Sequence, residues 1–266
     1  MHRGTLGLMS RRVLVTGSAR GIGRAIALRL AADGHDIAVS DLPSMAEELE
    51  HTRAEIEAVG VRAVALTGDV TDVLSVRHIV TETATRLGSL DIMVANAGIA
   101  QTKALLDVTP DEYDQVHRVN GRGVFLCYTE AARQMIGQGR GGKIIGAASI
   151  AGHKGFPLLG VYCSSKFGVR ALTQAAAQEW AEHGITVNAY CPGIVDTHMW
   201  VEVDRDLGAI NGMAEGESMK AMAQGITLGR VSQGSDVAAF VSYLAGPDSD
   251  YMTGQAPLID GGMFFA

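Results

Sequence analysis

The stretch Val13-Leu14-Val15-Thr16-Gly17-Ser18-Ala19-Arg20-Gly21-Ile22-Gly23 decides the fold, because a short apolar strand runs into a glycine-rich turn that opens a helix. Gly17 permits a tight turn, Gly21 lets the backbone approach a pyrophosphate, and Gly23 lets helix and strand pack closely. The free N–H groups and positive dipole end of the helix also favour a phosphate. An ordinary glycine-rich loop is the alternative, but the strand–turn–helix context favours a dinucleotide site.

Outward from this stretch, short apolar strands alternate with amphipathic helices. We expect further strands over residues 35–40, 61–66, 91–95, 143–147, 185–190 and 256–259. We expect helices over residues 22–32, 45–58, 73–87, 111–136, 161–183 and 236–244, with an irregular segment from 191 to about 229. Such alternation predicts parallel strands joined by right-handed crossovers, in a sheet covered on both faces. The predicted fold class is α/β, with a single-domain Rossmann-type doubly wound parallel sheet over residues 11–266 and an N-terminal tail over 1–10.

Composition narrows the class of protein. The 266 residues are 47% apolar and 19% charged, which is typical of a chain that folds around a core. The formal net charge of -7 and the lack of a basic cluster argue against nucleic acid as a partner. No apolar run approaches the ~20 residues of a membrane-spanning helix, so we expect no membrane partner.

The cysteines and the N-terminus indicate the compartment. Cys127, Cys163 and Cys191 are widely spaced and match no metal-ligand pattern, so we predict reduced thiols and no metal site. Residues 1–10 contain no long apolar stretch, so we expect no signal peptide, and Met9 offers an alternative start. These features predict a cytoplasmic protein.

Asp41 ends the second expected strand, where a carboxylate selects between dinucleotides. A carboxylate there bonds both hydroxyls of an adenosine ribose and repels a 2′-phosphate. Capping of the segment near Ser44 is the alternative role. Arg20 could hold a 2′-phosphate, but we expect Asp41 to prevail, since like charges in a confined site repel strongly. The predicted cofactor is NAD(H) rather than NADP(H).

Tyr162 and Lys166 carry the predicted chemistry. Their spacing puts both side chains on one face of an expected helix. An ammonium beside a phenol stabilises the phenolate and lowers its pKa, as a general acid/base for alcohol–carbonyl interconversion requires. A solvated helix face is the alternative, because Tyr-xxx-Lys occurs by chance in many helices.

Several motifs occur together in a definite order and spacing: Thr16 to Gly23, Asn96-Ala97-Gly98, Asn120, Ser149, Tyr162, Lys166 and Pro192-Gly193. In the residues, order and spacing of these motifs, the chain from Arg11 onward resembles the short-chain dehydrogenases/reductases. The resemblance implies a seven-stranded parallel sheet and a homotetramer with the Tyr162 helix at a subunit interface. One departure is Ala95, where the family usually has Asn; we expect only a packing change there.

The resemblance also implies site roles. Tyr162 would be the acid/base, and Lys166 would hold the nicotinamide ribose and lower the tyrosine pKa. Ser149 would orient the substrate carbonyl and stabilise its oxyanion, and Asn120 would hold a water that links Lys166 to solvent. The implied cofactor contacts are Gly17, Arg20, Gly21, Ile22, Gly23, Asp41, Leu42, Asp69, Val70, Asn96, Gly98, Tyr162, Lys166, Pro192, Gly193, Val195 and Thr197. Taken singly, Ser149 and Thr197 could be caps and Asn120 a helix terminator.

The predicted substrate wall is apolar. Its residues are Ser149, Ile150, Phe156, Tyr162, Met199 and Trp200. A wall with few polar partners suits a small ketone or vicinal diketone better than a sugar, because unpaired buried polar groups are costly. Contacts of Met199 and Trp200 with the protein itself are the alternative. We expect a mobile, glycine-containing lid over residues 196–228.

Several segments are similar to one group of the family, the diacetyl/acetoin reductases (2,3-butanediol dehydrogenases). They include Ser149-Ile150-Ala151-Gly152, Gly155-Phe156-Pro157, Met199-Trp200 and the ending Leu258 to Met263. Apolar residues at Ile150 and Phe156 resemble the L-type. Two alternatives remain: a reductase for another alcohol, such as a polyol, an aryl ketone or a biosynthetic intermediate, and a non-catalytic NAD-binding sensor. A pure sensor has no need for Ser149, Tyr162, Lys166 and Asn120 together.

Overall fold

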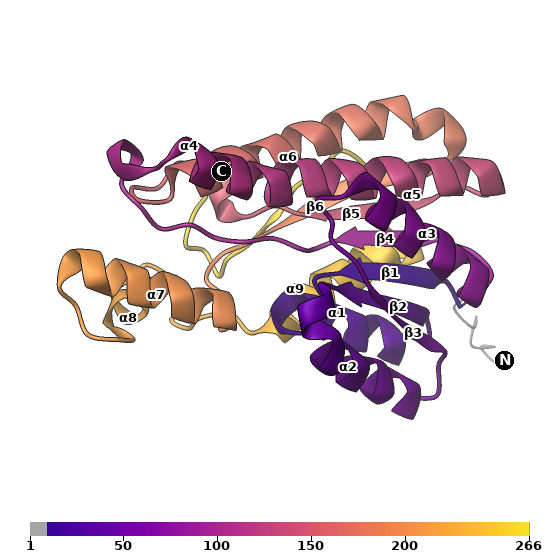
Figure 1. Ribbon diagram of the computed structural model, residues 1–266, viewed down its shortest axis with the longest axis horizontal. Coiled ribbons are helices and arrows are strands. Elements are labelled where there is room, and N and C mark those ends of the chain that lie inside the picture. The colour runs from indigo at the N-terminus through magenta and orange to yellow at the C-terminus, as the bar shows by residue number, and fades with distance from the viewer. Residues whose placement is uncertain (1–9, 266) are drawn as a thin grey trace, which may run out of the picture.

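The computed structural model describes residues 10–265 and has a seven-stranded sheet at its centre, with the strand order β3-β2-β1-β4-β5-β6-β7 (Figure 1). Each neighbouring pair runs parallel. The strands are β1 Arg12–Thr16, β2 Asp36–Asp41, β3 Ala63–Thr67, β4 Ile92–Ala95, β5 Gly142–Ala147, β6 Ile185–Pro192 and β7 Leu258–Ile259. The predicted doubly wound parallel sheet is confirmed.

Helices cover both faces of the sheet (Figure 1). One layer is α1 Gly21–Ala32, α2 Ala46–Ala58 and α9 Gly234–Ala245; the other is α3 Val73–Leu87, α5 Val124–Gln138 and α6 Gly160–Glu179. The strand side chains alternate between the two layers, so Leu14 packs with the α3–α5 core while Val13 and Val15 pack with the α1–α9 core. Burial on both faces explains why the strands are continuously apolar.

The long helix expected over residues 111–136 is interrupted. It consists of α4 Pro110–His117, a π-helical stretch Arg118–Gly123, and α5. Asn120 lies in the π-helical stretch, where its side chain bonds the backbone of Ile99. Single π-helical turns are frequent at functional sites.

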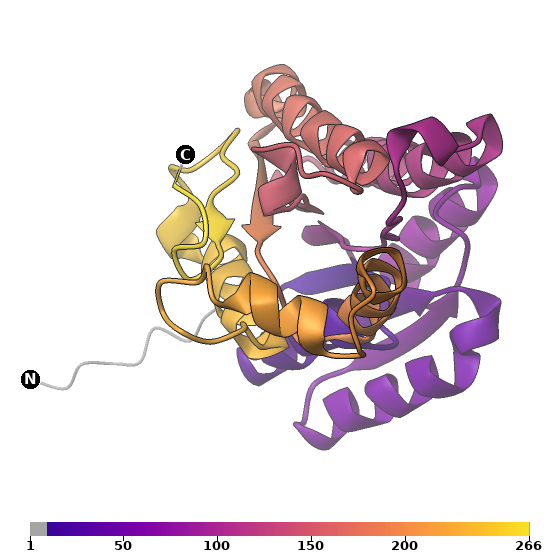
Figure 2. The ribbon, with the colours of Figure 1, turned by 90° about the vertical axis from the view of Figure 1, so that its left-hand side faces the viewer.

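The segment expected to be irregular also differs from the prediction. It contains α7 His198–Asn211 and α8 Glu217–Ala223, which project beyond the sheet (orange in Figures 1 and 2). Buried Asp204 on α7 accepts hydrogen bonds from the backbone N–H groups of Gly216 and Met219, so it ties the two helices together. These bonds join residues 12 and 15 positions apart, so they set how the two helices pack together, which a local sequence pattern does not indicate.

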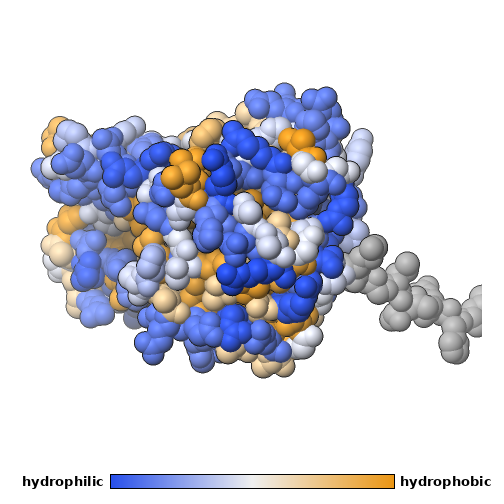
Figure 3. All heavy atoms as spheres, turned by 45° about the vertical axis from the view of Figure 1, so that its right-hand side comes forward, coloured by the Kyte–Doolittle hydropathy of each residue, from blue (hydrophilic) through white to orange (hydrophobic). Residues whose placement is uncertain are grey.

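Between residues 10 and 265, no helix is long and apolar enough to cross a membrane. Hydrophilic side chains cover most of the face in Figure 3, with hydrophobic groups between them. Cys127, Cys163 and Cys191 are free and buried. Most of the predicted N-terminal tail, including Met9, lies outside the described residues.

Candidate active site

A cavity of about 820 Å³ opens at the carboxyl ends of the strands. It lies where the strand order reverses between β1 and β4, the usual ligand position in open α/β sheets. Every residue predicted to contact a cofactor lines it: Gly17, Arg20, Gly21, Ile22, Gly23, Asp41, Leu42, Asp69, Val70, Asn96, Gly98, Tyr162, Lys166, Pro192, Gly193, Val195 and Thr197.

The glycine turn is packed too tightly for other residues. Gly17 has a φ of +63°, and a Cβ there would lie 2.8 Å from Ala97 Cα. A Cβ on Gly23 would collide with the Gly17 carbonyl oxygen. Asn96 holds the turn, because its Nδ2 donates to the carbonyl oxygens of Thr16 and Gly17 at 2.9 Å each. Its Oδ1 accepts from the Tyr190 hydroxyl at 2.8 Å.

The start of α1 is suited to a phosphate. Arg20 is the N-cap residue, and its side chain makes no hydrogen bond to the first N–H groups of the helix. Helix N-termini of this kind bind phosphate oxygens. The close-packed glycines and this helix start fit a dinucleotide.

Asp41 is fixed at the rim of the cavity. Its two carboxylate oxygens accept from the backbone N–H groups of Ala19 at 3.0 Å and Leu42 at 2.9 Å. Arg20 lines the same cavity and is exposed. The carboxylate is therefore oriented by the backbone, while the guanidinium is free to move.

Ser149, Tyr162 and Lys166 meet where this cavity joins a second one. Ser149 follows β5, and the other two lie one turn apart on α6. The Lys166 ammonium is buried and donates to the Ala147 carbonyl oxygen at 2.8 Å. It lies 5.6 Å from the centre of the Tyr162 ring.

The pKa of Tyr162 corrects one expectation. Burial raises this pKa to about 12, although the neighbouring Ser149 hydroxyl acts to lower it. Burial also lowers the pKa of Lys166 to about 8. The predicted lowering of the Tyr162 pKa is wrong for this structure, because desolvation of the phenol raises this pKa and the Lys166 ammonium bonds the Ala147 carbonyl oxygen instead of the phenol. At neutral pH the phenol is protonated and can donate a proton.

The Asn120 side chain makes three hydrogen bonds within the protein. Its Oδ1 accepts from Ile99 N–H at 2.9 Å, and its Nδ2 donates to Ile99 C=O at 2.8 Å and to Ser165 Oγ at 3.1 Å. The amide of Asn120 therefore anchors the π-helical stretch beside Lys166. That Asn120 holds a water stays a prediction. Because the side chain of Asn120 bonds Ile99 and Ser165, the backbone of Asn120 would hold that water.

The second cavity, of about 50 Å³, is the candidate substrate site. All six predicted residues, Ser149, Ile150, Phe156, Tyr162, Met199 and Trp200, line it. Sequence reasoning missed the remaining lining residues, which are Ala100, Ala151, Leu159, Gly193, Ile194, Val203, Met222 and Met263. Met263 follows β7, and its position after a parallel strand is the one sequence feature from which its place in the substrate wall could have been predicted.

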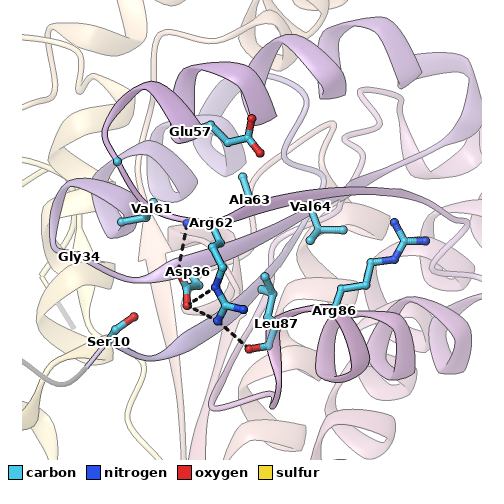
Figure 4. Close-up of a pocket in the computed structure, with 11 residues that line it drawn as sticks. Ser10, Gly34, Asp36, Glu57, Val61, Arg62, Ala63, Val64, Arg86 and Leu87 are labelled. Atoms are coloured by element: carbon cyan, nitrogen blue, oxygen red, sulfur yellow. Dashed lines mark hydrogen bonds and ion pairs between the residues drawn. The ribbon is translucent and has the colours of Figure 1, made fainter.

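A third cavity, of about 720 Å³, lies at the opposite edge of the sheet, near the amino ends of β2 and β3 (Figure 4). Its Arg62 guanidinium donates to Asp36 at 2.7 Å and to the Leu87 carbonyl oxygen at 2.8 Å. None of the predicted catalytic, cofactor or substrate residues lines this cavity, so it is not the candidate active site.

Comparisons with known proteins agree with this geometry. A family model described as short chain dehydrogenase matches residues 11–208. The L-2,3-butanediol dehydrogenase of Corynebacterium glutamicum is 50% identical over 97% of this chain and 100% of its own length. A diacetyl reductase [(S)-acetoin forming] of Staphylococcus epidermidis is 42% identical over 97% of this chain and 100% of its own.

A solved structure extends the likeness to three dimensions. A short-chain type dehydrogenase/reductase from Mycobacterium marinum superposes with a TM-score of 0.88 at 36% identity, over 98% of each chain. The chain therefore belongs to the short chain dehydrogenase family and is an oxidoreductase acting on alcohol and carbonyl groups.

Proposed function

We propose that this protein interconverts diacetyl, acetoin and 2,3-butanediol with NAD(H). The observation that carries the proposal is the substrate cavity, where no charged side chain lines the wall and Ser149 and Tyr162 supply the hydroxyls. Such a wall suits a short diketone and leaves the many hydroxyls of a sugar unpaired. The names of the two curated relatives support the same substrate class.

The chain's own residues would perform the proton chemistry. Bound NAD(H) supplies or accepts the hydride at the carbon. In reduction, the protonated Tyr162 phenol gives its proton to the carbonyl oxygen while the Ser149 hydroxyl bonds that oxygen. A phenolate formed at Tyr162 would attract the Lys166 ammonium, which lies 5.6 Å from the centre of the ring, and an ammonium whose pKa burial lowers to about 8 would be able to return a proton to it. In oxidation, the same groups act in reverse.

Asp41 supports NAD(H) as the cofactor. Both of its oxygens are held by backbone N–H groups at the cavity rim, which leaves a fixed negative charge where a 2′-phosphate would lie. Arg20 is exposed, so its charge is screened by solvent.

We also propose that the protein, which is acidic, works in the cytoplasm.

A substrate panel tests the proposed function. NADH oxidation would be followed with diacetyl, acetoin and a bulky aryl ketone, and the products separated on a chiral column. We expect kcat/KM for diacetyl to exceed that for the aryl ketone at least roughly tenfold, since each misfit group in an apolar pocket costs about 1–3 kcal/mol. Faster turnover of the aryl ketone would assign the protein to another alcohol.

A homotetramer is proposed from exposed apolar side chains around α4, α5 and α6. Leu106 is 99% exposed, Leu105 67%, Phe125 46% and Phe167 43%. Large apolar side chains exposed on elements that pack against one another are typical of association surfaces. Light scattering after gel filtration should give about four times the 28.0 kDa chain mass. A monomeric mass would contradict the tetramer.

A further inference from the structure

We infer that Met222 and Met263 set the length of substrate that the cavity accepts. This inference rests on the proposed function and deepens it. Both side chains line the substrate cavity, yet they come from α8 and from the turn after β7, far apart in the sequence. The other lid residues of the wall, Met199, Trp200 and Val203, all come from α7.

Two hydrogen bonds tie the backbone that carries Met222 to α7, within the segment predicted to be a lid. Asp204 on α7 is 2% exposed, and its carboxylate accepts from Met219 N–H at 2.7 Å and from Gly216 N–H. Met222 lies one helical turn after Met219. The carboxylate therefore joins α8 to α7, and α8 presents Met222 to the cavity as part of one unit with the α7 residues.

The turn that carries Met263 is fixed as well. The Asp260 carboxylate accepts from Gly262 N–H at 3.0 Å and from Phe264 N–H at 2.8 Å, on either side of Met263. The end of the lid reaches the same turn, because Leu228 N–H donates to the Gly261 carbonyl oxygen at 3.0 Å. The Thr227 hydroxyl donates to the Gly262 carbonyl oxygen at 2.7 Å. The lid and the C-terminal turn are thus hydrogen-bonded to each other on the same side of the molecule (Figure 2).

Because both backbones are held, the free space depends on the methionine side chains themselves. Methionine is unbranched and flexible, so it fills irregular gaps and closes around a small ligand. Shortening either side chain to a methyl group adds room beside the apolar wall. That room has no polar group to offer, so it favours a longer alkyl chain on the diketone.

The test uses Met222→Ala, Met263→Ala and the double variant with NADH and three diketones: diacetyl, 2,3-pentanedione and 2,3-hexanedione. We expect the ratio of kcat/KM for 2,3-hexanedione to that for diacetyl to rise roughly tenfold in each single variant, the size of effect that one or two methylene groups have in an apolar pocket. Met222→Phe should lower the same ratio. Phe265→Ala is the control, since this residue is 80% exposed and lies outside the cavity wall; its ratio should equal that of the parent protein.

The outcomes distinguish a failure of the proposed function from a failure of the role assigned to the two methionines. If the parent protein fails to reduce diacetyl, the proposed function is wrong. If the parent protein reduces diacetyl but the ratio stays constant in all methionine variants, only the present inference is overturned. A uniform fall in kcat/KM for all three diketones, with an unchanged ratio, also overturns it, because that pattern indicates a structural role for the two methionines.

Discussion

Replacement of Tyr162 by Phe should lower kcat for diketone reduction by about a thousandfold, the usual contribution of a positioned general acid. Phenylalanine keeps the ring that packs with Ala151, Leu159 and Cys163 but removes the only proton donor of Tyr162. The phenol is protonated at neutral pH, since burial raises its pKa to about 12, so its loss removes the acid itself. Binding of NADH should change little, because the glycine turn and Asp41 are untouched.

The measurement pairs steady-state kinetics with a fluorescence titration of NADH. Tyr128→Phe is the matched control, because Tyr128 is a buried phenol that bonds Thr173 at 2.9 Å and does not line either site cavity. The control should lose thermal stability but keep kcat. Undiminished turnover by Tyr162→Phe would show that another group donates the proton, and the assigned chemistry would have to be abandoned.

Local patterns predicted most of the fold. The strand–turn–helix stretch at the start and the repeated apolar strands require parallel neighbours, and the order β3-β2-β1-β4-β5-β6-β7 agrees with that prediction. Carboxyl ends of parallel strands meet at one edge, so the residues that follow them, such as Gly17, Asn96 and Ser149, come together around one cavity. Sequence order was sufficient for this part because the topology follows simple rules.

What the sequence could not predict depends on contacts between distant residues. The π-helical stretch at Asn120 is held by bonds to Ile99, and α8 is held against α7 by the Asp204 carboxylate. Met222 and Met263 belong to the substrate wall only because their segments fold against it. The Tyr162 pKa has the same origin: spacing on a helix indicates a nearby lysine, but the dominant desolvation comes from the surrounding fold.

Replacement of Asp41 should change the cofactor preference by about a hundredfold in favour of NADPH, as expected when a hydrogen-bonding charged group worth roughly 1.5–3 kcal/mol is removed. The carboxylate bonds the N–H groups of Ala19 and Leu42, so Asp41→Ala also loosens the rim and raises KM for NADH. Asp41→Asn keeps the shape and one acceptor but loses the charge. The two variants therefore separate repulsion of a 2′-phosphate from the loss of order at the rim.

The ratio of kcat/KM for NADPH to that for NADH is measured for the parent protein, Arg20→Ala, Asp41→Asn, Asp41→Ala, and each Asp41 variant combined with Arg20→Ala. If Arg20 receives the 2′-phosphate once the carboxylate is gone, its removal should cancel much of the gain, and the coupling between the two residues is read from the double-mutant cycle. If Asp41→Asn leaves the ratio unchanged, the negative charge does not select the cofactor. Equal use of NADH and NADPH by the parent protein would likewise contradict the choice of NAD(H), because a fixed carboxylate at the ribose should repel the 2′-phosphate of NADPH.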